Sequence, residues 1–255
     1  MSPHAAASKG RILVGVGGWN FAPWRGSFYP KGLKQAQELH FASRELTSIE
    51  INSTFYGLQK PATFQKWHDE TPDEFMFSLK APRFVMHRKR LAEGASSLER
   101  FLASGILHLG AKLGPINWQL APEKSFDAQE IADFLALLPP EADGRPLRHA
   151  LEARHPSFDC EEFFALAREH EVAIVESGDS EYPHIEARTA PFSYLRLMGT
   201  QAGSATGYAP AALARWQAHA QTLARSGDVF LYFISGAKER NPQAARALIA
   251  ALGRR

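Results

Sequence analysis

Short strand-like runs of apolar residues alternate along this chain with longer helical patterns. The strand-like runs are rich in β-branched and aromatic residues and alternate apolar and polar positions with a period of two. They cover residues 11–18, 47–52, 74–81, 114–120, 148–154, 172–177, 192–199 and 228–235. Amphipathic helical patterns lie near 34–45, 61–70, 97–112, 127–138, 160–170, 210–225 and 242–252. The segment between the sixth and seventh strands, 178–190, shows no helical pattern.

Two helix starts carry recognisable local signals. Asn241 followed by Pro242 predicts an N-cap and a first-turn proline. Asp159 with Glu162 resembles a capping box, which predicts the start of the helix near residue 160.

Strands that alternate with helices in this way predict an α/β fold with a parallel sheet. Eight such units in 255 residues favour a closed (β/α)8 TIM-type barrel, irregular where the helix between strands six and seven is missing. A doubly wound open sheet is the alternative. It is disfavoured because "GVGGWN", after the first strand, lacks the GxGxxG spacing of a phosphate-binding turn. We expect one barrel domain over residues 11–255, preceded by a frayed segment at 1–10.

Composition limits the classes of protein that fit this pattern. The net charge of +2 is too small to indicate nucleic-acid binding by itself. The only cysteine, Cys160, excludes an internal disulfide and a cysteine-based zinc site. No apolar run is long enough for a transmembrane helix, and the first ten residues lack the apolar core of a signal peptide. We therefore expect a cytoplasmic protein with no membrane partner.

Polar residues gather at the ends of the predicted strands. In a TIM barrel the carboxyl ends of the strands form the active-site face, so side chains there are the first candidates for a site. Period-two alternation places Ile49 and Ile51 of "TSIEINSTFY" on one face and Glu50 on the other. The polar residues at or just after the strand ends are Glu50, Asn52, Lys80, Arg83, Asn117, Gln119, Glu152, Arg154, His155, Arg196 and Lys238.

The excess of cations in this set favours an anionic small-molecule ligand that carries a phosphate or a carboxylate. In the leading hypothesis the protein is a metal-independent, hydrolase-like enzyme, and Lys80, Arg154 and Arg196 bind the anion. Glu50 or Glu152 would transfer a proton, with His155 as a partner. The alternative without a ligand is that these charges only pair with one another inside the barrel.

Two other functions also fit the residues. Glu50 and Glu152 could be the acid and base of a glycoside hydrolase, with Trp19 and Trp24 of an aromatic loop stacking on sugars, unless that loop is only a hydrophobic lid. The protein could instead be a non-catalytic binding module, in which the basic segment "RFVMHRKRL" (residues 83–91) contacts nucleic acid. We expect no cofactor and no metal, because the histidines are scattered and no HExxH spacing occurs.

Several blocks of the chain resemble the YecE-like family, a bacterial and archaeal group of unknown function. They are "VGVGGWNFAPWRGSFYPKGL", "IEINSTFYGLQKPATFQKWHDETPDEFMFSLKAPRF", "LGPINWQLAP" and "ARHPSF". The resemblance implies a TIM-type barrel and no established reaction. The motif positions in or beside the predicted site are Trp19, Trp24, Glu50, Asn52, Tyr56, Lys80, Gln119, Arg154, His155 and Arg196. Met198 and the Ser235–Gly236 pair depart from the family pattern, which puts a role for those two positions in doubt.

Overall fold

The eight predicted strands form a closed parallel barrel in the computed structural model, which describes residues 9–253. Around the barrel the strand order is β1, β10, β9, β8, β7, β4, β3, β2. This confirms the TIM-barrel prediction over the open sheet. The predicted frayed segment lies mostly outside the described residues. The barrel strands are β1 (Ile12–Gly17), β2 (Ser48–Ile51), β3 (Met76–Lys80), β4 (Leu113–Gln119), β7 (His149–Glu152), β8 (Ala173–Gly178), β9 (Phe192–Leu197) and β10 (Asp228–Phe233).

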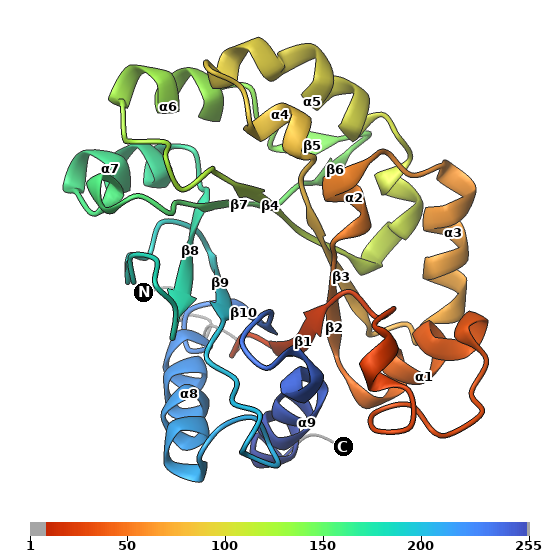
Figure 1. Ribbon diagram of the computed structural model, residues 1–255. Helices are drawn as coiled ribbons and strands as arrows, with labels where there is room; N and C mark the ends of the chain where they lie inside the picture. Colours follow the sequence, from red (N-terminus) through yellow and green to blue (C-terminus); the bar gives the residue numbers. More distant parts are fainter. Residues whose placement is uncertain (1–8, 254–255) are drawn as a thin grey trace, which may run out of the picture.

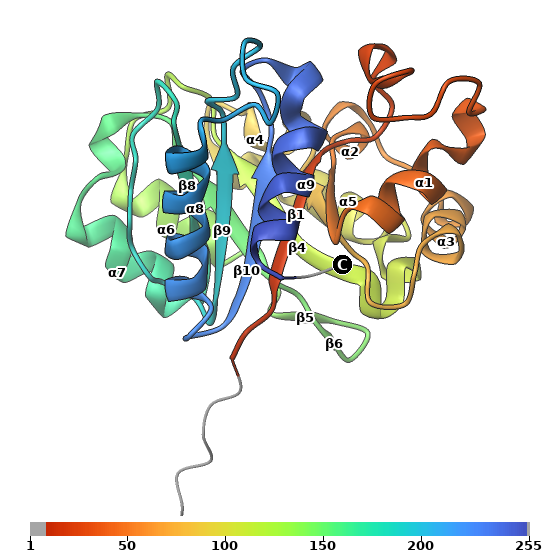
Figure 2. The ribbon, with the colours of Figure 1, turned by 90° about the horizontal axis from the view of Figure 1, so that it is seen from below.

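Helices surround the barrel, as Figure 1 shows along its axis. They are α1 (Glu38–Glu45), α2 (Ser53–Tyr56), α3 (Pro61–Glu70), α4 (Arg83–Met86), α5 (Ala95–Leu102), α6 (Ala128–Leu135), α7 (Glu161–Glu169), α8 (Pro210–Leu223) and α9 (Asn241–Ala251). Short 3-10 helices cover Ala22–Trp24, Gln35–Gln37, Leu91–Gly94, Ile106–Lys112, Pro156–Phe158 and Lys238–Arg240. In Figure 2 the barrel strands point to one end, and the antiparallel hairpin of β5 (Glu141–Ala142) and β6 (Arg145–Pro146) lies at the other.

The period-two alternation of the strands separates two cores. Outward residues such as Ile49 and Ile51 join the large apolar layer between the strands and the helices. Inward residues near the amino ends of the strands, among them Leu13, Met76 and Phe230, form a smaller apolar plug inside the barrel. Above this plug the Tyr232 hydroxyl contacts the Ser48 and Ser78 hydroxyl oxygens at 2.7 and 2.6 Å. The charged residues therefore lie above a closed floor.

The missing helix between strands six and seven is confirmed, because residues 179–191 between β8 and β9 contain no helix. Three local predictions were wrong in detail. The helix predicted at 97–112 breaks after α5, where Gly105 adopts a φ of 107°. The Asp159 capping box does not form, because Cys160 precedes α7 and no side chain caps that helix. Asn241 is the first residue of α9 rather than its N-cap, and its side chain instead accepts a hydrogen bond from Thr200.

At Gly15 the backbone of β1 approaches that of β2 so closely that a side chain has no room. A Cβ atom there would lie 1.8 Å from the Ser48 carbonyl oxygen in β2. We expect Gly15→Ala to lower the free energy of unfolding by about 3 kcal/mol, because the two strands must separate to admit the methyl group. Urea denaturation followed by circular dichroism measures the change.

The matched control is Gly57→Ala. A Cβ atom at Gly57 meets no other atom within 4 Å, and the φ there is −176°, which any residue adopts. An equal loss of stability in both variants would contradict the packing argument.

Candidate functional site

A buried arginine joins the two glutamates at the carboxyl ends of the strands. The Arg196 guanidinium donates to both oxygens of Glu50, at 3.1 and 3.0 Å, and to Glu152 at 2.6 Å. Glu50 and Glu152 are fully buried, and Arg196 is 1% exposed. The three residues come from β2, β7 and β9, so only a closed barrel brings them together.

Glu152 is held ionised by its surroundings. Besides Arg196, it accepts hydrogen bonds from Arg154 at 2.9 Å and from Gln119 at 2.8 Å. Burial alone would raise the pKa of Glu152, but the charges of Arg196 and Arg154 outweigh it and lower the pKa to about 2. Glu152 is thus a poor general acid, and as a base it is weak at neutral pH.

Glu50 has one more strong partner. The Tyr194 hydroxyl donates to it at 2.7 Å, and burial together with the Glu50 charge raises the pKa of Tyr194 well above its usual range. Tyr194 therefore remains a neutral hydrogen-bond donor. Asn117 donates to both glutamates at 3.4 and 3.2 Å, while its own carbonyl oxygen is buried without a hydrogen-bond partner among the described residues.

Lys80 is a further cation beside Glu50 and Glu152, at the carboxyl end of β3. Among residues 9–253, no carboxylate lies within ion-pair distance of its ammonium nitrogen, which instead sits 4.1 Å from the centre of the Phe55 ring. Burial, followed by the Arg196 charge, lowers the pKa of Lys80 to about 8, although Glu50 and Glu152 act in the opposite direction. An amine with this pKa can exchange protons at physiological pH.

The other predicted site residues surround this cluster at different depths. Arg154 stacks 4.2 Å from the Tyr182 ring centre. His155 is half-buried, and its Nδ1 contacts the Ser157 hydroxyl at 2.7 Å. Asn52 precedes α2 beside Gly17, and Tyr56 is 70% exposed on that helix. Lys238 lies 4.5 Å from the Phe21 ring centre, where burial lowers its pKa.

The positions of Trp19 and Trp24 favour the hypothesis that the aromatic loop is a hydrophobic lid over the hypothesis that it stacks on sugars. Trp24 is fully buried, and its indole N–H donates to the Lys238 carbonyl oxygen at 2.9 Å. Trp19 packs edge-on against Trp67, with ring centres 5.2 Å apart. In this conformation Trp24 has no face open to a ligand, so it belongs to the structure of the loop.

Asn117 was listed among the strand-end residues without a role, and three further contributors, Tyr194, Tyr182 and Phe55, were not among the predicted site residues. Asn117 and Tyr194 share the inner face with Gln119 and Arg196, so strand alternation was a usable signal for both. Tyr182 lies in the helix-free segment, and Phe55 lies in a short helix, α2, that no pattern predicted. The strand and helix patterns gave no positional signal for either residue, although Phe55 lies in the "EINSTFY" stretch that carries the family resemblance.

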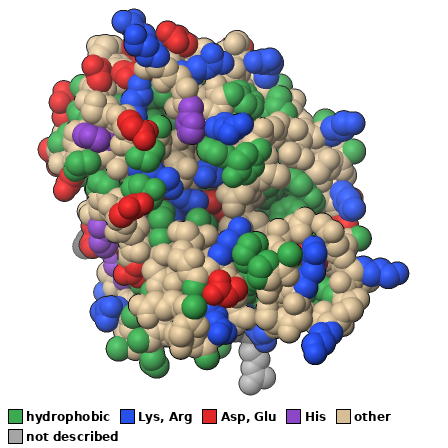
Figure 3. All heavy atoms as spheres, in the orientation of Figure 1, with side chains coloured by type: hydrophobic (Ala, Val, Ile, Leu, Met, Phe, Trp, Pro, Cys, Tyr) green, Lys and Arg blue, Asp and Glu red, His purple; other side chains and the backbone are tan. Residues whose placement is uncertain are grey.

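The face that holds this cluster is hollowed. Figure 3 looks along the barrel axis onto the carboxyl ends of the strands and shows a depression near the centre with Lys and Arg side chains around it. We call the cluster of Glu50, Lys80, Asn117, Gln119, Glu152, Arg154, Tyr194 and Arg196 the barrel-mouth cluster. Within this cluster the arginines neutralise the two glutamates, and the Lys80 ammonium is left without an ion-pair partner among the described residues.

Comparisons with known proteins agree with this fold. A family model described as "Protein of unknown function DUF72" matches residues 13–255. The chain belongs to this DUF72 family. The resemblance to YecE-like proteins is thereby confirmed, since UPF0759 protein YecE of Escherichia coli (strain K12) is 27% identical over 150 residues, 58% of this chain and 50% of that protein. The chain spans about half the length of the curated relatives it matches first.

Solved structures show the same barrel. A DUF72 family protein from Thermotoga maritima has a TM-score of 0.76 at 22% identity, covering 95% of this chain and 99% of that one. A xylose isomerase-like TIM barrel/4-hydroxyphenylpyruvate dioxygenase fusion protein has a TM-score of 0.56 at 14% identity, covering 95% of this chain and 43% of that one. At these identities the likeness establishes the fold of this DUF72 protein alone. Among its described residues, no helix is long and apolar enough to cross a membrane.

Arg196 offers a test of the buried network. We expect Arg196→Met to lower the free energy of unfolding by about 3–5 kcal/mol, because two buried carboxylates lose their shared cation. Chemical denaturation measures the loss. Arg168→Met is the control, since that arginine makes an exposed ion pair with Glu161 and should cost about 1 kcal/mol or less.

A double variant separates the charge effect from simple loss of packing. Adding Glu50→Gln to Arg196→Met removes one of the orphaned charges, so part of the lost stability should return. If the double variant is no more stable than Arg196→Met, the charge explanation is wrong.

Proposed function

We propose that this DUF72 protein binds a small phosphate- or carboxylate-bearing molecule at the barrel mouth and acts on it as a hydrolase-like enzyme, with Lys80 as the proton-transfer group. The proposal rests on the Lys80 ammonium, which makes no ion pair with any carboxylate of residues 9–253. The two carboxylates near it, Glu50 and Glu152, are already neutralised by arginines. Three cations face two carboxylates in the cluster, so an anion would complete its charge balance.

In this proposal the residues divide the work differently from the sequence-based hypothesis. Arg196 is engaged on three bonds with Glu50 and Glu152, so it shapes the electrostatics of the site rather than binding the ligand. Arg154 keeps 16% of its side chain exposed and can contact an anion together with Lys80. The neutral Lys80 amine takes a proton from water or a substrate hydroxyl, and the ammonium then returns a proton to the leaving group.

The donor set at the mouth supports chemistry without a metal. A divalent cation needs oxygen or nitrogen ligands that are free, whereas both glutamates are bonded to Arg196 and lie near the Lys80 charge. The glycosidase alternative is less well supported, because a general acid needs a raised pKa and the pKa of Glu152 is lowered to about 2.

A nucleic acid strand is the second candidate ligand. Residues 87–90, "HRKR", are exposed, and the Arg83 guanidinium carbon lies 5.9 Å from the Tyr56 ring centre. The His87 ring lies 5.8 Å from that of Phe55, which in turn contacts Lys80. Basic and aromatic groups thus extend from the mouth onto its rim, as single-strand binding surfaces do.

The titration of Lys80 is directly measurable. We expect the rate at which acetic anhydride modifies Lys80 to rise with a midpoint near pH 8, because the lowered pKa leaves about half of the amines neutral there. Peptide mass spectrometry of samples labelled from pH 6 to pH 11 gives the profile. A short lysine-containing model peptide, labelled in parallel, gives the reference midpoint of about 10.4. A Lys80 midpoint that coincides with that of the model peptide would contradict the assigned role.

Ligand binding is tested by thermal shift with inorganic phosphate, sugar phosphates, nucleotides, neutral sugars and short oligonucleotides. We expect at least one phosphate-bearing compound to raise the melting temperature, since it binds only the folded barrel. Lys80→Met should remove this shift, and Lys31→Met should keep it.

The pattern of shifts also separates the alternatives. A shift with neutral sugars alone would favour the glycosidase. A shift with oligonucleotides alone, steeply reduced by salt, would favour the nucleic-acid module. No shift with any anion would overturn the proposal.

A further inference from the structure

The gap left by the missing helix contains a second polar cluster on the outer face of the barrel. The segment 179–191 lies beside β8 and β9 where other units place a helix, and α8 flanks it (Figure 1). On β8, Val175 points into the barrel, and period two therefore directs Glu176 outward. This cluster is separated from the barrel mouth by the barrel wall.

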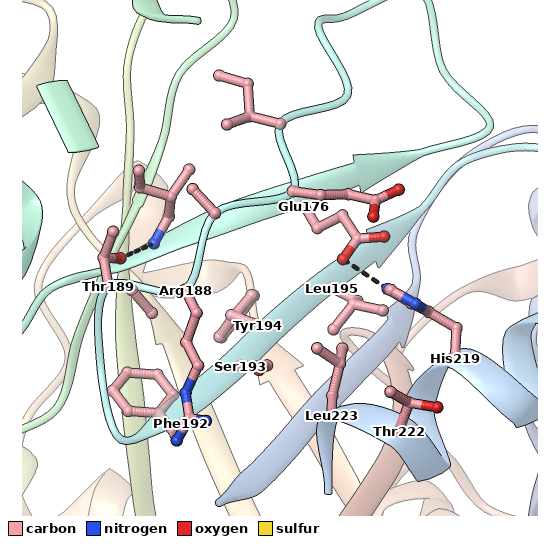
Figure 4. Close-up of a pocket in the computed structure, with 15 residues that line it drawn as sticks. Glu176, Arg188, Thr189, Phe192, Ser193, Tyr194, Leu195, His219, Thr222 and Leu223 are labelled. Carbon is pink, nitrogen blue, oxygen red and sulfur yellow. Dashed lines mark hydrogen bonds and ion pairs between the residues drawn. The ribbon is translucent and has the colours of Figure 1, made fainter. Parts of the chain in front are cut away.

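Glu176 is an unusual residue for this surface, because it is a carboxylate that is only 6% exposed among apolar neighbours. Each of its oxygens meets a different histidine. The His184 Nε2 atom, from the helix-free segment, lies 2.8 Å from Oε1, and the His219 Nε2 atom, from α8, lies 2.8 Å from Oε2. Figure 4 shows Glu176 and His219 pointing toward each other across the pocket.

A second carboxylate completes the group. The Glu186 carboxylate lies 3.6 Å from the His184 Nε2 atom, and its side chain is 62% exposed. One ligand atom from each of Glu176, His184 and Glu186 lies within 4.8 Å of the others. These residues line a cavity of about 240 Å³, with Asp179, Arg215, Trp216 and His219 as its other walls. The three carboxylates outnumber the one arginine, so the cavity favours a cation.

We propose that Glu176, His184 and Glu186 bind a divalent transition-metal ion, with Zn²⁺ as the best match, and that His219 positions Glu176. Imidazole nitrogen and carboxylate oxygen are the ligands that zinc takes in proteins, at about 2.0–2.2 Å. In a tetrahedral zinc site the ligand atoms lie roughly 3.4 Å apart, so the present atoms, which lie within 4.8 Å of one another, must close by up to about 1.4 Å. The exposed Glu186 side chain is free to make that movement.

The ion would hold the helix-free segment against the barrel. Its ligands come from β8 and from two positions in that segment, while His219 ties Glu176 to α8. A metal there replaces the packing that a helix supplies elsewhere, and binding to the folded state raises stability by mass action. This proposal departs from the expectation of no metal. That expectation rested on the spacing of histidines along the sequence, whereas these ligands come together only in the folded chain.

The experiment uses the full chain without a tag, stripped with a chelator and dialysed, and then titrated with ZnCl₂ in a calorimeter. We expect one Zn²⁺ per chain, confirmed by elemental analysis after dialysis, and a rise in melting temperature with added Zn²⁺. Glu186→Gln and His184→Ala should each weaken binding by more than tenfold. His219→Gln should weaken it by about 10–100-fold, as the loss of a positioning residue does.

The matched control is His68→Ala, which removes a half-buried histidine that pairs with Asp69 at 2.9 Å and has no third ligand among the described residues. It should bind Zn²⁺ as the unaltered protein does. Because the Glu186 side chain is exposed, Glu186→Gln should keep the melting temperature of the metal-free protein, which separates lost binding from lost folding. Absence of stoichiometric Zn²⁺, or binding that His184→Ala and Glu186→Gln leave unchanged, would overturn the proposal. Lys80→Met should bind Zn²⁺ normally, so this site and the barrel mouth can fail independently.

Discussion

The bonds between Arg196 and the two buried glutamates are the interaction on which the rest of the barrel mouth depends. Glu50, Glu152 and Arg196 are almost completely removed from water, and each would be costly alone. Together they satisfy one another through direct hydrogen bonds from β9 to β2 and β7. The network thus ties three strands and fixes which charges remain available at the surface of the cluster.

The network also decides which charged side chain of the barrel-mouth cluster is left without an ion-pair partner. With Glu50 and Glu152 occupied by arginines, Lys80 keeps a charge that no neighbouring carboxylate fully compensates, and burial lowers its pKa to about 8. A lysine in this state is a better candidate for proton transfer than a glutamate whose pKa is about 2. The buried network therefore leaves Lys80 as the group to which we assign proton transfer in the proposed function.

Buried carboxylates on the two faces of the barrel wall have different partners. Inside, arginines offset the carboxylates, while outside, Glu176 is offset by two histidines in a place that a helix would otherwise cover. Histidines are weaker partners for a carboxylate than arginines, because each imidazole here offers one N–H to Glu176 whereas a guanidinium offers up to five. A buried carboxylate with such partners is well suited to an added cation.

Much of this structure was determined by local sequence. The eight strands, the missing helix and the direction of Ile49, Glu50 and Ile51 followed from period-two patterns, because alternation in a strand is a local property. Helix ends were less predictable. Gly105 lies so close to Pro61 that a side chain there would collide with it, and Asn241 accepts a hydrogen bond from Thr200. Both partners are distant in the sequence.

Only the tertiary structure decided which polar residues meet. Arg196 lies 146 positions from Glu50. The sequence predicted that both lie at the barrel mouth, but it could not predict that they pair with each other while Lys80 makes no ion pair. The sequence left open whether the aromatic loop is a sugar platform or a hydrophobic lid, and the burial of Trp24 favours the lid. The cluster of Glu176, His184, Glu186 and His219 has no spacing motif at all. Such sites arise from closure of the barrel, which joins side chains by distance in space rather than in sequence.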